Sequence, residues 1–208
     1  MPAMRDGHLF NVISAEFKTT AVEATGWPKP DRPEIAFAGR SNVGKSSMIN
    51  ALCKRKKLVR VSNTPGRTRT LNFFDVTVED RSGRRHEVRF CDLPGYGFAK
   101  ASKGERADWA KMIEFYVKGR EELRAVVCIV DAEVGPTSDD VDVIPWVLKA
   151  GRPVIVAATK VDRLPKHKRV PRQQEVEAKL GLGKGEALVV SSTEGLNLDQ
   201  LWARILAL

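Results

Sequence analysis

The segment between residues 34 and 52 constrains the fold more than any other part of the sequence. The apolar run EIAFAG at 34–39 predicts a buried strand, and KSSMINAL at 45–52 predicts a helix. The loop that joins them, GRSNVGKS at 39–46, matches the pattern GxxxxGK(S/T). Its glycines let the backbone turn tightly and bring N–H groups against phosphate oxygens. This order of strand, loop and helix predicts a nucleotide-phosphate site inside an α/β fold.

Further apolar strands alternate with helices along the rest of the chain. This alternation predicts a three-layer α/β fold, in which helices cover both faces of a mostly parallel, six-stranded sheet. The turn RSGR at 81–84 predicts a hairpin that supplies one antiparallel strand at the sheet edge. The other expected strands lie at 71–78, 87–93, 125–132, 153–159 and 187–192.

The chain divides by composition near residue 34. Residues 1–33 are polar and interrupted by prolines, so we expect an N-terminal extension that packs on the domain and adds a short strand or turn. Residues 34–208 are expected to form the nucleotide-binding domain.

The loop at 39–46 has residues suited to phosphate and magnesium. The helix after it directs its positive end at the phosphates. Lys45 is expected to reach the β- and γ-phosphates, and the Ser46 hydroxyl to ligate magnesium (Mg2+). A glycine turn with a solvated lysine is the alternative, and the flanking strand and helix argue against it. The predicted nucleotide-binding residues of this loop are Gly39, Arg40, Ser41, Asn42, Val43, Gly44, Lys45 and Ser46.

A second motif, DLPG, stands at the end of the strand expected at 87–93. Asp92 can hold magnesium through a water molecule, and Gly95 can offer its N–H group to a γ-phosphate and move when that phosphate leaves. The pattern DxxG is common by chance, so its position after a strand carries the argument. The predicted nucleotide-binding residues here are Asp92, Leu93, Pro94 and Gly95.

A third motif, TKVD, follows the strand expected at 153–159. A carboxylate at Asp162 can accept two hydrogen bonds from N1–H and the exocyclic amine of guanine, a donor pair that adenine lacks. The motif therefore predicts a preference for GTP over ATP, whereas an exposed Lys/Asp turn is the alternative. The predicted guanine-binding residues are Thr159, Lys160, Val161 and Asp162.

The fourth candidate is the run Ser191, Ser192 and Thr193 after the last expected strand. Its backbone N–H groups can meet the guanine O6 atom. A Ser/Thr run before a helix is also an ordinary helix cap. Only its order among the motifs along the chain favours assigning it to the nucleotide site.

The basic segment between Leu58 and Leu71 is expected to be a switch loop. A threonine of such a loop completes the magnesium shell when the γ-phosphate is present. Thr64, Thr68 and Thr70 are candidates, and their chemistry alone does not rank them.

The net charge of the chain indicates a class of binding partner. The charge is +9, and the basic residues cluster at 54–57, at 81–85 and at 166–172. This excess indicates that the partner is a polyanion such as nucleic acid, although it also serves solubility.

No apolar run approaches the ~20 residues of a membrane helix, and no secretory signal is visible at the start. Three dispersed cysteines argue against disulfides and zinc, with Cys91 and Cys128 expected in the core, so we expect a cytoplasmic protein.

The ordered segments GRSNVGKSS, TPGRTRTLNFF, DLPGYGFA, TKVD and SS resemble the EngB (YihA/YsxC) family, of the TrmE-Era-EngA-EngB group of P-loop GTPases, over roughly residues 10–208. The resemblance implies a Ras-like fold and a role in assembly of the large ribosomal subunit, and the family is also linked to cell division and septation. By motif position it implies that Thr68 is the magnesium-binding switch threonine. The nucleotide-contacting segment it implies is Gly66, Arg67, Thr68, Arg69 and Thr70. Thr159 in place of the general asparagine is usual in this family.

One residue that Ras-like switches use is replaced. A glutamine after DxxG orients the attacking water in such switches, and here Tyr96 occupies that position. No catalytic residue can therefore be assigned, and we expect slow GTP hydrolysis unless another residue, a cation or a partner supplies the missing group. Asn42 matches an asparagine of related potassium-activated GTPases and is a candidate K+ ligand, whereas a role as a loop cap is the alternative.

The leading hypothesis is a monomeric, GTP-dependent assembly factor that binds the large ribosomal subunit and its rRNA, with no membrane partner. A GTP-dependent binding module for a division protein, with hydrolysis incidental, is the second hypothesis. Strong salt dependence of binding favours the first. A third hypothesis, an ATP-dependent kinase or transferase, conflicts with a guanine-reading Asp162.

Overall fold

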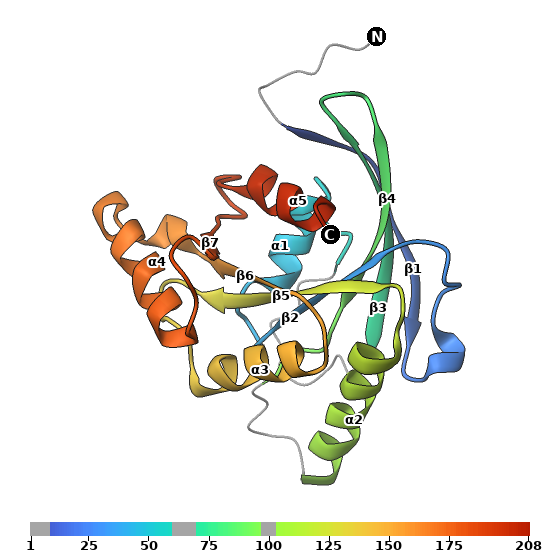
Figure 1. Ribbon diagram of the computed structural model, residues 1–208. Helices are drawn as coiled ribbons and strands as arrows, with labels where there is room; N and C mark the ends of the chain where they lie inside the picture. The colour runs from blue at the N-terminus through green and yellow to red at the C-terminus, as the bar shows by residue number, and fades with distance from the viewer. Residues whose placement is uncertain (1–8, 60–69, 97–102) are drawn as a thin grey trace.

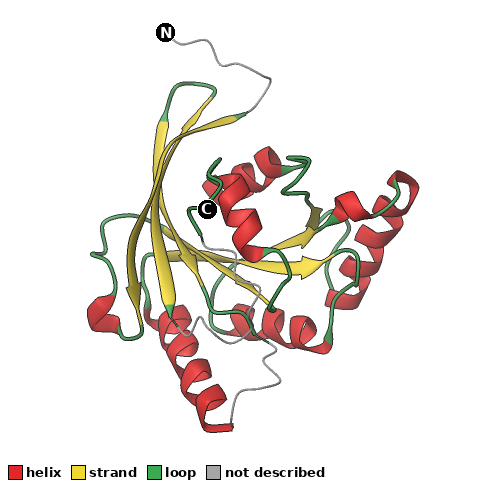
Figure 2. Cartoon of the chain, turned by 180° about the vertical axis from the view of Figure 1, so that it is seen from behind, coloured by secondary structure: helices red, strands yellow, loops and turns green. Residues whose placement is uncertain are grey.

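The computed structural model describes residues 9–59, 70–96 and 103–208. These residues form a sheet in the order β1-β3-β4-β2-β5-β6-β7, with helices on both faces (Figures 1 and 2). The strands are β1 (Phe10–Ala21), β2 (Glu34–Gly39), β3 (Leu71–Asp80), β4 (Arg85–Asp92), β5 (Leu123–Asp131), β6 (Val154–Thr159) and β7 (Ala187–Val189). The helices are α1 (Lys45–Leu52), α2 (Lys103–Gly119), α3 (Ser138–Lys149), α4 (Lys166–Leu180) and α5 (Leu198–Leu206), with 3-10 turns η1 (Ala24–Gly26) and η2 (Val161–Arg163). The mostly parallel, three-layer α/β fold is confirmed.

The predicted number of six strands is wrong, because the N-terminal segment adds a seventh. Strand β1 pairs with β3 along its whole length in antiparallel register, from Phe10 opposite Asp80 to Ala21 opposite Leu71. Strand β3 is antiparallel to both neighbours and therefore lies one place inside the edge, not at it. The division of the chain at residue 34 stays a prediction.

The register of β1 explains why the sequence predicts only a short strand or turn in this segment. Irregularities between Val12 and Ser14 and between Phe17 and Thr19 shift the pairing. Each shift reverses which side chains face the core, because side chains alternate along a strand. A search for strict alternation over 10–21 therefore fails, although β-branched residues are frequent there.

Side chains of the central strands alternate between two apolar layers. Phe37 of β2 and Val127 of β5 face the layer of α1 and α5, whereas Ala36 and Val126 face the layer of α2, α3 and α4. Both faces of the central strands are thus buried, which accounts for their continuous apolar sequences.

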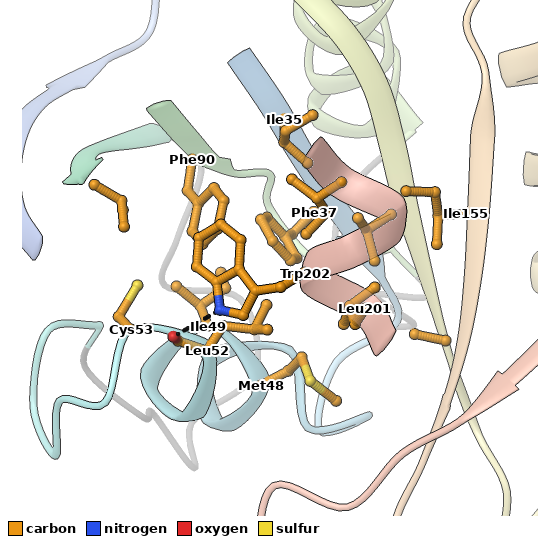
Figure 3. Packing of buried hydrophobic residues seen from close by; sticks show 14 of the residues in the cluster. Ile35, Phe37, Met48, Ile49, Leu52, Cys53, Phe90, Ile155, Leu201 and Trp202 are labelled. Carbon is orange, nitrogen blue, oxygen red and sulfur yellow. Dashed lines mark hydrogen bonds between the residues drawn. The ribbon is translucent and has the colours of Figure 1, made fainter. Parts of the chain in front are cut away.

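Trp202 of α5 joins α5 to α1 and to the sheet. Its ring stacks on Phe90 with centroids 5.3 Å apart, and its Nε1–H donates to the carbonyl oxygen of Leu52 at 3.1 Å (Figure 3). Leu52 is the last residue of α1, where carbonyl groups lack partners inside the helix. The indole therefore caps α1 while it fills the core beside Phe37.

A buried charge cluster lies at the start of β2, where Glu34 is opposite Arg89 of β4. The carboxylate of Glu34, fully buried, accepts from Arg120 at 2.6 Å and from the hydroxyl of Tyr116 at 2.9 Å. Arg89, also fully buried, lies 3.4 Å from Glu34 and 2.6 Å from Asp75. Further bonds from the two guanidinium groups reach the N-terminal segment, at the carbonyl oxygens of Pro28 and Lys29 and at the carboxylate of Asp31.

The cysteines are core residues, as expected for Cys91 and Cys128. Burial raises the pKa of Cys53 and of Cys128 to about 12, and it raises the pKa of Cys91 as well. All three are therefore neutral thiols near pH 7. Among the described residues, none of the helices has the length and apolar composition that a membrane crossing requires.

Candidate nucleotide-binding site

Five parallel strands end on the same side of the sheet, and four neighbouring ones are considered first because a loop with a candidate residue follows each. In sheet order these are β4, β2, β5 and β6, which end at Asp92, Gly39, Asp131 and Thr159. Ligands of open α/β sheets bind beyond the carboxyl ends of the strands. The topology therefore places three predicted motifs side by side, together with Asp131, which no motif includes.

The loop between β2 and α1 has the backbone form that a phosphate requires. Gly44 adopts φ 99° and Asn42 adopts φ 64°, both in the left-handed region. A Cβ atom at Gly39 would lie 2.8 Å from Val43 and 3.0 Å from the carbonyl oxygen of Ile129, so only glycine fits there. The N–H groups of residues 44–47 have no hydrogen-bond partner in the described part of the chain. The first turn of α1 is therefore ready to receive an anion.

Lys45 and Asp92 meet beside this turn. The Lys45 ammonium forms an ion pair with Asp92 Oδ1, and both side chains are nearly buried. The contact joins the first helical turn, which also carries Ser46, to the end of β4. The Lys45 ammonium, which can bind phosphate oxygens, therefore lies beside Ser46 and Asp92, whose oxygen atoms can bind a divalent metal.

This donor set suits magnesium. Mg2+ prefers oxygen ligands and is commonly held by one or two protein oxygens together with phosphates and water. In the described ranges no cluster of three or more His, Cys, Asp or Glu side chains could hold a metal by itself. Ser46 and Asp92 therefore fit a metal that arrives with a nucleotide.

The DxxG motif packs directly on the phosphate-binding loop. The N–H of Tyr96 donates to the carbonyl oxygen of Gly39, and the N–H of Ser41 donates to the carbonyl oxygen of Tyr96, each at 3.2 Å. A Cβ atom at Gly95 would lie 3.1 Å from the backbone nitrogen of Ser41. Glycine at this position permits the close approach of the two loops.

The side chain of Tyr96 is a structural anchor. It is 8% exposed, and its hydroxyl donates to Asp140 Oδ1 of α3 at 2.7 Å. Asp140 also accepts from the N–H and the hydroxyl of Thr137, which caps α3. Burial, together with the Asp140 carboxylate, raises the pKa of Tyr96, so the phenol stays protonated. In this conformation Tyr96 joins the end of the DxxG loop to α3, and its protonated hydroxyl is not available as a base.

The TKVD motif is attached to the phosphate-binding loop by its first two residues. The Thr159 hydroxyl is buried and lies 2.6 Å from the carbonyl oxygen of Val43. The Lys160 ammonium donates to the carbonyl oxygen of Asn42 at 3.0 Å. A hydroxyl at position 159 is thus sufficient to join the two loops, although most GTPases have asparagine there.

Asp162 and Ser191 also meet. The Ser191 hydroxyl donates to Asp162 Oδ1 at 2.7 Å and accepts the N–H groups of Thr193 at 3.2 Å and Glu194 at 3.0 Å. The N–H of Ser191 itself donates to the carbonyl oxygen of Leu196 at 3.2 Å. Of the three N–H groups considered for guanine O6, that of Ser192 alone has no partner among the described residues. Ser191 therefore orients the Asp162 carboxylate.

Some predicted site residues fall outside the described residues. These are Gly66, Arg67, Thr68 and Arg69 of the predicted switch loop, and Thr64 among the threonine candidates. Thr70 is described and directly precedes β3. The magnesium role of Thr68 stays a prediction.

A phosphate-binding loop, a DxxG loop and a carboxylate placed to read guanine define a P-loop GTP-binding protein. A family model described as "50S ribosome-binding GTPase" matches residues 34–160. The chain is 56% identical over 198 residues to the "Probable GTP-binding protein EngB" of Myxococcus xanthus (strain DK1622), covering 95% of this chain and 96% of the relative. A relative with the same name from Streptococcus mutans serotype c is 45% identical over 197 residues, covering 94% and 96%. The chain belongs to the EngB family of GTP-binding proteins, a family of GTPases.

Solved structures agree on the fold. The crystal structure of a probable GTP-binding protein engB has a TM-score of 0.62 and 26% identity, covering 84% of this chain and 97% of that chain. Era in complex with MgGDPNP and nucleotides 1506–1542 of 16S ribosomal RNA has a TM-score of 0.67 and 26% identity, covering 84% of this chain and 56% of that chain. These likenesses confirm the predicted Ras-like P-loop GTPase fold.

Proposed function

We propose that this protein is a GTP-hydrolysing switch that binds the large ribosomal subunit during its assembly. The match of residues 34–160 to a family described as 50S ribosome-binding GTPases carries this proposal. The net charge of +9 supports it, because rRNA presents a dense array of phosphates. We propose a cytoplasmic monomer, with the family's link to division following from its role in ribosome assembly.

The nucleotide site supports Mg-GTP as the ligand. Lys45 and the free N–H groups of the first turn of α1 would receive the phosphates, and Asp162 would read guanine. Ser46, Thr68 and, through water, Asp92 would hold Mg2+, which when bound neutralises phosphate charge. Gly95 packs so closely on the phosphate-binding loop that an added Cβ atom would lie 3.1 Å from the Ser41 nitrogen, and this position would let it respond to the γ-phosphate.

Slow intrinsic hydrolysis follows from Tyr96. A Ras-like switch has a glutamine side chain free to orient water at this position, whereas the Tyr96 hydroxyl is bonded to Asp140. The missing catalytic group would then come from a partner or from a monovalent cation.

Asn42 is the candidate ligand for that cation. Its side chain is exposed and makes no hydrogen bond to another described residue, which disfavours the loop-cap alternative. Its positive φ offers a further reason for asparagine, because asparagine tolerates this conformation better than most residues.

Potassium is expected to raise GTP turnover about tenfold over sodium, which corresponds to about 1.4 kcal/mol of transition-state stabilisation. Steady-state phosphate release in the two chloride salts at equal ionic strength measures this. Asn42→Gly, which keeps the positive φ and removes the amide, is expected to abolish the difference. Equal turnover of the unchanged protein in both salts would exclude a potassium site.

The exposed residues 54–57 are the best candidates for contact with rRNA phosphates. They follow α1, and none of their side chains forms an ion pair with another described residue. In the cluster on α4, by contrast, Arg169 pairs with Glu194 at 3.2 Å and Arg172 with Glu175 at 3.4 Å. Cations without an acidic neighbour interact more strongly with a polyanion.

Replacing Lys54, Lys56 and Lys57 together by glutamine is expected to weaken binding to the large subunit at least ~10-fold and to lower the salt slope by about 2. Co-sedimentation with purified subunits at several salt concentrations, with GDP and with a non-hydrolysable GTP analogue, measures both quantities. Binding is expected to be stronger with the analogue.

The matched control replaces three exposed lysines that lie on different helices, Lys118, Lys149 and Lys179, by glutamine. It changes the net charge equally and is expected to reduce binding less than about threefold. Equal losses in both triple variants would remove the assignment of the 54–57 segment. Absence of any nucleotide-dependent association would remove the ribosomal function itself.

A further inference from the structure

Asp131 is a buried carboxylate at the edge of the sheet that carries the nucleotide-binding loops. It ends β5, and its side chain is 4% exposed. Its Oδ1 atom accepts the N–H groups of Glu133 at 2.9 Å and Val134 at 3.3 Å, which closes the turn after the strand. Its Oδ2 atom faces two cations that come from two different loops.

These cations are Lys160 and Arg40. Lys160 Nζ donates to Asp131 Oδ2 at 2.7 Å and to the carbonyl oxygen of Asn42 at 3.0 Å. Arg40 Nη2 lies 3.9 Å from the same Oδ2 atom. Through Lys160, Asp131 thus connects the loop after β6 to the phosphate-binding loop after β2.

We infer that Asp131 is a positioning residue for guanine nucleotides, which holds Lys160 in the conformation that joins the base-reading loop to the phosphate-binding loop. The inference rests on the proposed nucleotide site. A lysine has a long, flexible stem whose rotamer freedom is lost when it is ordered. Because the buried carboxylate already holds the ammonium, the entropic cost of ordering Lys160 is not added when the nucleotide binds.

The two oxygens of Asp131 allow its roles to be separated. In Asp131→Asn the amide oxygen can still accept the N–H groups of Glu133 and Val134, so the turn is retained. The amide nitrogen then replaces Oδ2 and cannot accept from Lys160. A loss of nucleotide affinity in this variant therefore reports the contact with the ammonium.

The test measures the dissociation constant of the full chain for N-methylanthraniloyl-GDP with magnesium. The proteins compared are the unchanged chain, Asp131→Asn, Lys160→Met and the double variant. Asp131→Asn is expected to weaken binding about tenfold, because it removes a charge-assisted hydrogen bond. In the Lys160→Met background the same change is expected to weaken binding less than about twofold. Asp142→Asn, an exposed carboxylate on α3, is the matched control and is expected to have no effect.

Equal weakening by Asp131→Asn in both backgrounds would overturn the inference, because the effect of Asp131 would then not depend on Lys160. No weakening in either background would overturn it as well. Should Asp131→Asn fail to unfold cooperatively on heating, Asp131→Ser replaces it, since a serine hydroxyl can also accept the turn N–H groups. If GDP does not bind the unchanged chain, the nucleotide site itself fails. If Asp162→Asn abolishes GDP binding and Asp131→Asn does not alter it, this inference alone fails.

Discussion

Replacing Asp162 by asparagine is expected to lower the affinity for GDP about 100-fold or more, because one hydrogen bond is replaced by two opposed donors and the other loses its charged acceptor. Guanine offers two N–H donors, and the asparagine amide would present a donor to one of them. The same amide would complement xanthine, which has a carbonyl oxygen where guanine has its amine. The variant is therefore expected to bind xanthosine diphosphate better than GDP. Fluorescence competition with both nucleotides measures the reversal.

The fold should tolerate this change. Asparagine has the shape of aspartate, and its oxygen can still accept from the Ser191 hydroxyl, as Asp162 Oδ1 does at 2.7 Å. Asp142→Asn, with the same change in charge on the exposed surface of α3, is the control and should leave the order of affinities as it is. An Asp162→Asn protein that still prefers GDP would show that another group reads the base.

Removing the buried carboxylate by Glu34→Gln is expected to lower the free energy of unfolding by about 3 kcal/mol, since Arg120 and Arg89 would lose a buried counter-charge. Removing one partner of a buried ion pair commonly costs about 3–5 kcal/mol. We expect the lower value because Arg89 keeps Asp75 at 2.6 Å and Arg120 keeps Glu122 at 3.1 Å. Urea unfolding monitored by circular dichroism gives the difference.

A surface ion pair provides the comparison. Glu79→Gln breaks the pair with Arg85 at 3.5 Å, in which the arginine side chain is 67% exposed. This change is expected to cost less than about 1 kcal/mol. Similar losses in the two variants would mean that the buried cluster contributes no more than a surface pair.

The placement of the predicted nucleotide-binding motifs could be derived from the sequence, because each motif follows an apolar strand. Parallel strands bring their carboxyl ends together, so the order of motifs along the chain is enough to place Lys45, Asp92 and Asp162 at one edge. Side-chain partners were not predictable in this way. The Tyr96–Asp140 bond and the Lys160–Asp131 pair depend on loop conformations and on the neighbourhood of strands that lie far apart in sequence.

The sequence indicated only a short strand or turn in the N-terminal segment, and it did not indicate the buried charges. Two register shifts interrupt the alternation of β1, so its pattern does not show the full length of the strand. Arg89 and Glu34 belong to residue types that usually lie at the surface, and nothing in the local sequence shows that they are buried together. Asp131 could have been recognised as a candidate site residue from the sequence, because it ends an apolar strand as Asp92 does.

The most direct test of the proposed guanine site is the nucleotide selectivity of the unchanged protein. Bound N-methylanthraniloyl-GDP is displaced by GDP, GTP, ADP and ATP in turn, with magnesium present. GDP and GTP are expected to compete at least ~100-fold better than ADP and ATP, because only guanine offers the donor pair that Asp162 accepts. Equal competition by adenine and guanine nucleotides would contradict the guanine-specific site on which the proposed function depends.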